Sequence, residues 1–242
     1  MTASLADVAA VVLASRGGAR LASALDGVAW AGERIVLDPA GRLGGEPLPD
    51  GVRWAGEPAE AARAAWLLLV EEHEAVRPSL VAAIASALEA PGARAYRIAQ
   101  EVIAFGTTLR LRHAPVRLAR RDGVRLRLRT GLTPELAAGG GRAPRLPERL
   151  VTNAVPTLAA AVEELDAQAA TLAALLHARR VRPRAWHLVV PPLAASARAL
   201  LARGRAGGLW GRWTLAVLDG YRALVAYAKL WEMRREEAAR RR

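Results

Sequence analysis

Three short, continuous apolar runs in the first third of the chain constrain its fold more than any other feature. They are residues 7–15 (DVAAVVLAS), 33–38 (ERIVLD) and 66–70 (WLLLV). Such runs are too short to span a membrane and lack alternating polar residues, which is typical of strands buried on both faces of a parallel sheet. A segment with helical spacing, residues 17–30, separates the first two runs. The order predicts a β-α-β unit and an α/β fold.

The rest of the chain divides into a strand-rich middle and a helical end. Residues 93–113 and 123–130 alternate apolar and polar side chains, which predicts antiparallel or edge strands. Further on, leucine and alanine recur at helical spacing. The expected helices are residues 157–180, 193–203 and 209–238. We therefore expect an α/β domain over residues 1–155 and a helical C-terminal extension over residues 156–242.

The positive net charge of the chain favours negatively charged partners. The chain carries a formal net charge of +12, and every cationic side chain except Lys229 is an arginine. Guanidinium groups bind phosphates through paired hydrogen bonds and stay protonated, which suits phosphorylated ligands or an anionic membrane surface. No nucleic acid is expected as a partner, because no recognition motif is present and the arginine-rich residues 110–129 include no aromatic side chain for base stacking.

Features that the sequence lacks exclude several kinds of site and segment. The sequence has no cysteine, which rules out disulfides and thiolate zinc sites and fits a reducing compartment. No run of about 18 apolar residues is present, so a membrane-spanning helix is not expected. These features predict a cytoplasmic protein.

Acidic and imidazole side chains follow the third apolar run directly, at Glu71, Glu72, His73 and Glu74. In open parallel sheets ligands bind beyond the carboxyl ends of the strands, and Asp38 ends the second run, so these groups can meet at one site. Glu71 and His73 point to the same side if strand geometry persists. Two interpretations remain for the cluster, a set of metal ligands or a solvated turn. For Asp38 they are a nucleotide contact or a cap of the following turn.

At these residues the sequence resembles the family-2 glycosyltransferases, in particular the bacterial lipopolysaccharide-core type. Residues 10–43 follow the opening strand-helix-strand of that family without a gap and keep Trp30 and Asp38. Residues 64–80 match its next segment in register, and YAKLWEMRR (227–235) looks like its closing segment. The resemblance covers nearly the whole chain. It implies an α/β, GT-A-like (Rossmann-like) nucleotide-diphospho-sugar transferase fold with a helical C-terminal extension.

The resemblance also implies an activity and a site. A sugar would move from a nucleotide-sugar donor to a cell-envelope glycolipid or polysaccharide acceptor, with a divalent metal, Mn²⁺ or Mg²⁺, bridging the donor diphosphate. At the matching positions, Glu71 and His73 would bind the metal. Asp38 and Arg16 stand at the nucleotide-binding positions, and Glu135 would activate the acceptor hydroxyl as the catalytic base.

Several of these positions depart from the family pattern. Arg16 and Gly17 replace an Asn-Glu pair that helps to hold the nucleotide, and the second aspartate of the family's second-strand motif falls on Leu43. The family's Asp-Ala-Asp metal motif is replaced by Glu-Glu-His at residues 71–73. The alternative is therefore a catalytically degenerate pseudo-glycosyltransferase that acts as an interaction or scaffold module.

The last predicted helix carries an aromatic stripe and a basic end. The stripe is Trp210, Trp213, Val217, Tyr221, Leu224, Ala228 and Trp231. Such a helix can lie in the interface of an anionic membrane, with the arginines at 234–235 and 240–242 adding electrostatic attraction. The protein would then be peripheral to the inner face of the cytoplasmic membrane. The alternative is that the stripe packs on the rest of the protein or on a second subunit.

Overall fold

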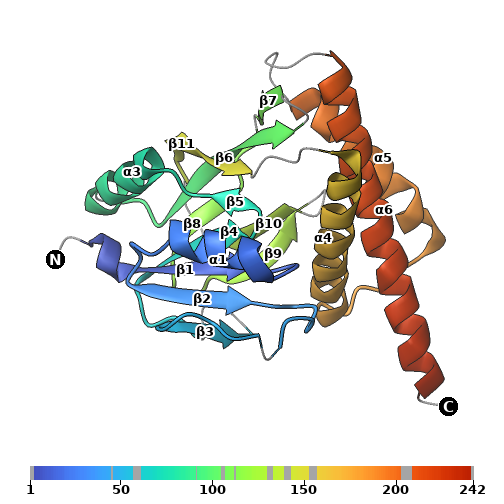
Figure 1. Ribbon diagram of the computed structural model, residues 1–242, viewed down its shortest axis with the longest axis horizontal. Coiled ribbons are helices and arrows are strands. Elements are labelled where there is room, and N and C mark those ends of the chain that lie inside the picture. The colour runs from blue at the N-terminus through green and yellow to red at the C-terminus, as the bar shows by residue number, and fades with distance from the viewer. Residues whose placement is uncertain are drawn as a thin grey trace.

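The computed structural model is an α/β structure, with a mixed, curled sheet on one side and a group of helices on the other (Figure 1). The described residues are 3–44, 46–56, 61–90, 92–104, 107–111, 113–129, 133–138, 143–152, 157–202 and 209–240. All statements about the structure concern these residues.

Four parallel strands form the first half of the sheet, in the order β3-β2-β1-β4. They are β1 (Val8–Leu13), β2 (Glu33–Leu37), β3 (Val52–Ala55) and β4 (Trp66–Glu71). The helix α1 (Gly18–Gly27) connects β1 to β2. The β-α-β unit expected from the apolar runs is therefore confirmed. Its order places β1 and β4 side by side, and a ligand site is expected where the loops after such a pair diverge.

The second half of the sheet is mixed. Its strands are β8 (Val116–Arg120), β6 (Ala95–Ala104), β11 (Arg145–Thr152), β5 (Glu74–Ala75) and β7 (Thr107–Arg110). β8 runs antiparallel between β4 and β6, and β11 runs parallel to β6. β5 pairs with β11, and β7 pairs with β6. This half confirms the strands expected within residues 93–113.

Smaller elements surround the sheet. They are the 3₁₀ turn η1 (Leu5–Asp7), the helix α3 (Pro78–Glu89), and the strands β9 (Arg125–Arg129) and β10 (Thr133–Ala137). β9 and β10 pair with each other in a separate antiparallel sheet. The start of α3 follows from its sequence, because Pro78 occupies the first helical turn, where its missing N–H costs no hydrogen bond.

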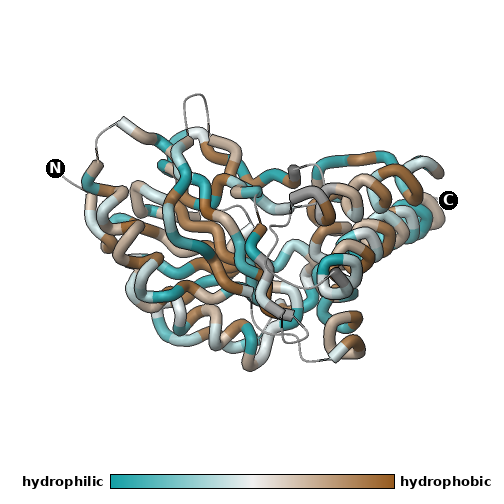
Figure 2. The backbone as a smooth tube through the Cα atoms, turned by 90° about the horizontal axis from the view of Figure 1, so that it is seen from above, coloured by the Kyte–Doolittle hydropathy of each residue, from teal (hydrophilic) through white to brown (hydrophobic). Residues whose placement is uncertain are grey.

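Both faces of the central strands are covered, which explains their continuous apolar sequence. Along β1, Val8, Ala10 and Val12 face a core shared with α1 and α3. The intervening Ala9, Val11 and Leu13 face a second core that includes side chains of β9, β10 and α4 (Leu158–Ala178). In Figure 2 the strands at the middle of the sheet are largely brown, whereas the helices at the other end mix teal and brown.

The helical end comprises α4, the 3₁₀ turn η2 (Ala185–Leu188), α5 (Val190–Ala202) and α6 (Leu209–Arg240). The three expected helices are confirmed, but the expected start of the second at residue 193 was wrong. Pro191 and Pro192 lie in the first turn of α5 instead of before it, because an N-terminal turn tolerates missing N–H groups. α4 stands between the sheet and α6, facing the ends of the parallel strands (Figure 1).

Candidate functional site

A cavity of about 160 Å³ lies where the parallel strands end, between the sheet and the helices α4 and α6. Glu71 at the end of β4, His73 just after it and Arg20 on α1 line one side. Gln168 on α4 and Arg222 on α6 line the other. Apolar side chains complete the wall, among them Val102, Leu111, Leu165, Leu215 and Leu218. The cavity is thus at the sheet edge where open α/β sheets bind ligands.

A fully buried arginine stands behind this wall. Nη2 of Arg117, on β8, donates to Glu71 Oε1 at 2.6 Å and to Glu74 Oε1 at 3.2 Å. Burial by itself raises the pKa of Glu71, but the charge of Arg117 and its hydrogen bond outweigh this effect, so the pKa lies below its ordinary value. Burial likewise opposes the charge of Arg117, and the two carboxylates hold its pKa above the ordinary value. The cavity therefore faces an ionised Glu71.

Glu72 turns away from Glu71 and fills the loop after β1. Its Oε2 accepts hydrogen bonds from the backbone N–H groups of residues 15–17, at 2.6, 2.9 and 3.2 Å. The next N–H, of Gly18, donates to Glu46 at 2.9 Å. A loop that leads into a helix N-terminus is commonly where backbone N–H groups bind phosphate. Here carboxylates of the same chain satisfy these groups.

These contacts test one of the two earlier interpretations of the cluster, the solvated turn. The carboxylates of Glu71, Glu72 and Glu74 belong to residues that are at most 7% exposed, so the solvated-turn interpretation was wrong. A further, partly buried hydrogen bond joins Gln100, which donates to Glu74. The cluster supports the junction of β4, β8 and the β1 loop through internal hydrogen bonds and ion pairs.

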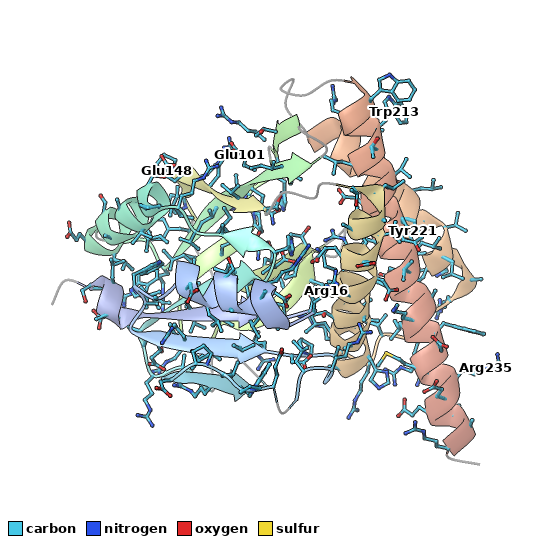
Figure 3. The ribbon with its side chains drawn as sticks, viewed as in Figure 1. Arg16, Glu101, Glu148, Trp213, Tyr221 and Arg235 are labelled. Carbon is cyan, nitrogen blue, oxygen red and sulfur yellow. The ribbon has the colours of Figure 1, made fainter. Side chains whose placement is uncertain are left out.

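The two expected nucleotide contacts lie at neighbouring strand ends. Oδ2 of Asp38, directly after β2, accepts a hydrogen bond from the backbone N–H of Leu43 at 2.6 Å, and so caps the turn that follows. Arg16 extends toward α4, where its Nη2 is 3.5 Å from Glu163 Oε2 (Figure 3). Neither side chain is among the residues that line the cavity. Their role in nucleotide binding stays a prediction.

The expected catalytic base is not brought to the cavity. Glu135 lies on β10, is only 1% exposed, and pairs with Arg127 at 2.7 Å. Among the described residues, those that line the cavity include Glu71 and His73 but not Glu135. The structure therefore joins the two expected metal ligands and leaves the expected base in the separate β9-β10 sheet.

The donor set at the cavity is a poor fit for Mn²⁺ or Mg²⁺. The described part of the chain holds no group of three or more His, Asp or Glu side chains that could bind a metal ion. One oxygen of Glu71 already binds Arg117, and Nδ1 of His73 is 3.3 Å from Nε2 of Gln168. A cation on Glu71 would therefore lie close to a buried positive charge. The divalent metal stays a prediction.

A chain of polar contacts across the cavity was missed by the sequence reasoning. Arg20 donates to Glu164, and Gln168 Nε2 donates to Glu164 Oε1 at 3.1 Å. Arg222 Nη1 then donates to Gln168 Oε1 at 3.4 Å, so that α1, α4 and α6 are linked. The sequence feature that could have indicated these contacts is the pair Glu164 and Gln168, four residues apart in a helix otherwise rich in leucine and alanine. Residues at that spacing share one helix face.

No helix of the described residues is long and apolar enough to cross a membrane. Neither a scan against protein-family models nor a search of curated proteins finds a match to this chain. The likeness to the family-2 glycosyltransferases therefore rests on the residues quoted from the sequence.

Proposed function

We propose that the protein is a glycosyltransferase of GT-A type that moves a sugar from a nucleotide-sugar donor to a cell-envelope glycolipid or polysaccharide acceptor. The observation that carries the proposal is the cavity at the ends of the parallel strands, with Glu71 and His73 on its wall. The parallel order β3-β2-β1-β4 is compatible with a nucleotide-binding sheet. The sequence resemblance supplies the reaction class.

The cavity wall combines the groups that sugars and phosphates need. An ionised Glu71 can accept hydrogen bonds from sugar hydroxyls, and the amide of Gln168 can donate or accept them. Leu215 and Leu218 can pack against the apolar face of a ring. The guanidinium group of Arg222 can offer paired hydrogen bonds to phosphate oxygens. Glu71, Gln168 and Arg222 would thus hold the sugar or the phosphate part of a donor in this cavity, between the sheet and the helices α4 and α6.

Calorimetry tests the proposal. We expect saturable binding of UDP, GDP or one of their sugars by the full-length protein, measured with and without Mn²⁺. Arg222→Gln should weaken that binding at least about tenfold, because a charge-assisted hydrogen bond is lost. Lys229→Gln is the matched control, since Lys229 is on the same helix but pairs with Asp166 outside the cavity. The absence of binding by every nucleotide at millimolar concentration would overturn the proposal.

A second candidate is the catalytically degenerate pseudo-glycosyltransferase, a scaffold with the same fold. Two observations favour it: Glu72 fills the amide loop after β1, and Glu71 is engaged by Arg117. The variants Glu71→Gln and His73→Ala separate the candidates in cells that lack the native protein. A scaffold predicts that both variants restore the envelope phenotype of such cells, whereas an enzyme that uses these side chains predicts that they fail.

The proposed location is the inner face of the cytoplasmic membrane, with α6 as the tether to an anionic surface. The aromatic stripe of α6 supports this location, because Trp210, Trp213, Tyr221 and Trp231 are all exposed. Figure 3 shows Trp213 and Tyr221 on the side of α6 that faces away from the sheet. The alternative that the stripe packs on the rest of the protein was wrong, whereas packing on a second subunit stays a prediction. A membrane location would bring the cavity close to a lipid-linked acceptor.

A further inference from the structure

Large exposed apolar side chains are confined to the helical end of the molecule. The described residues contain thirteen of them, and none lies on the sheet. Two, Leu158 and Val162, are on α4. The other eleven are Trp186, Leu188, Val189, Val190, Leu193, Trp210, Trp213, Val217, Tyr221, Leu224 and Trp231. Scattered exposed apolar residues need no explanation, but a concentration of this size on one part of the surface indicates an interaction site.

The eleven side chains belong to elements that are packed against each other. His187 in η2 stacks on Tyr227 of α6, with ring centroids 4.9 Å apart, and Trp186 stacks on His187 at 3.8 Å. α5 crosses α6 closely at Gly220, where an added Cβ would overlap Ser196 Oγ and lie 3.1 Å from the Pro192 carbonyl oxygen. η2 and the start of α5 therefore lie beside the middle of α6, away from the sheet (Figure 1).

Arginines border the same surface. Arg180, Arg182 and Arg184 are exposed and come directly before Trp186 in the chain. At the other end, the guanidinium group of Arg235 lies 5.5 Å from the ring centroid of Trp231. Tryptophan rings prefer the headgroup level of a bilayer, and arginines attract anionic headgroups. A second copy of this chain would bring its own net charge of +12 to the contact, which opposes self-association.

We propose that η2, the first turns of α5 and the outer face of α6 form one docking surface for an anionic phospholipid bilayer. The inference deepens the membrane partner of the proposed function, on which it rests, by adding residues 180–193 to the α6 tether. Within α6, Arg222 lines the cavity and the adjacent Tyr221 lies on the outer face, so a single helix separates the cavity from the bilayer.

Vesicle flotation with the full-length protein tests the apolar part of the surface. We expect binding to vesicles that contain phosphatidylglycerol and much weaker binding to pure phosphatidylcholine. The double variant Val189→Ser/Leu193→Ser should reduce binding at least about tenfold. The reason is that it removes apolar groups of two side chains that would be buried in the bilayer. The matched control is Leu158→Ser/Val162→Ser, which removes the two exposed side chains outside the surface. Equal binding by the two double variants would overturn the proposal.

The contribution of the arginines at the edge of the docking surface is tested in the same flotation assay. Arg182→Gln/Arg184→Gln should weaken binding to anionic vesicles, whereas Arg94→Gln/Arg125→Gln, which removes two exposed arginines elsewhere, should weaken it clearly less. Sedimentation velocity without vesicles tests self-association. Concentration-dependent dimers that are abolished by Val189→Ser/Leu193→Ser, together with no vesicle binding by the native protein, would show that the surface is a self-interface and overturn the proposal.

The experiments separate this inference from the proposed function. Nucleotide binding by Val189→Ser/Leu193→Ser in solution should equal that of the native protein, because neither side chain lines the cavity. A protein that floats with vesicles but binds no nucleotide retains the docking surface and loses the glycosyltransferase proposal. A protein that binds nucleotide but does not float with vesicles retains the glycosyltransferase proposal and loses the docking surface.

Discussion

Among single residues, Arg117 is the one on which the candidate site depends most. It is completely buried and forms ion pairs with both Glu71 and Glu74. We expect Arg117→Leu to lower the free energy of unfolding by about 3–5 kcal/mol, because it leaves two carboxylates in the interior without their cation. Urea denaturation at neutral pH measures the change. The control Arg125→Leu, at an exposed position, should change stability by less than about 0.5 kcal/mol. Similar values for the two variants would contradict this account.

Glu71 itself predicts a pH dependence. Its pKa in the folded protein lies below the ordinary value of 4.5, so it contributes stability above that value and loses it as the pH falls through the folded pKa. We expect the native protein to lose stability below about pH 4.5 more steeply than Glu71→Gln, which has no charge to lose. Urea titrations of both proteins between pH 7 and pH 3 measure the two slopes. Parallel slopes would show that Glu71 titrates normally.

Some residues of the candidate site could be predicted from the sequence, and others could not. The apolar runs located β1, β2 and β4, and the position of Glu71 and His73 at the end of β4 followed from them. Arg117 could not be found in this way, because β8 lies outside the segments predicted as strands and an arginine is expected to face solvent. Its partner Glu71 is 46 residues away in the chain, and the contact depends on the antiparallel pairing of β8 with β4.

At the scale of elements, the packing of α5 on α6 depends on Gly220. Glycine in a helix interior is unfavourable on its own, so its presence is explained by the close approach of Ser196 and Pro192. We expect Gly220→Val to lower the free energy of unfolding by about 1–3 kcal/mol through overpacking. Ala228→Val, at an exposed position of the same helix, is the control and should cost less than about 0.7 kcal/mol. Thermal or urea unfolding of the two variants decides the point.

The periodicity of α6 predicted a helix and its aromatic stripe, but not that it has two different apolar faces. One face is buried through Ala223, Ala226 and Leu230 in a core shared with α4. The stripe of larger side chains points outward. A single sequence distinguishes these faces poorly, because small residues at helical spacing give a weak signal even where helices pack most closely. Removing α6 to test the tether would therefore expose part of the core, so point variants of exposed side chains are the appropriate test.

Across the whole molecule, the net charge of +12 and the apolar surface should act on vesicle binding in different ways. The Debye length is about 10 Å at 0.1 M salt and about 3 Å at 1 M, so salt screens the arginines but not the buried apolar area. We expect binding to anionic vesicles to fall steeply as salt rises and then to level off at a residual value. Arg182→Gln/Arg184→Gln should flatten the salt dependence, and Val189→Ser/Leu193→Ser should lower the residual value. Flotation across a salt series measures both, and an unchanged slope for the arginine variant would assign the attraction to another part of the molecule.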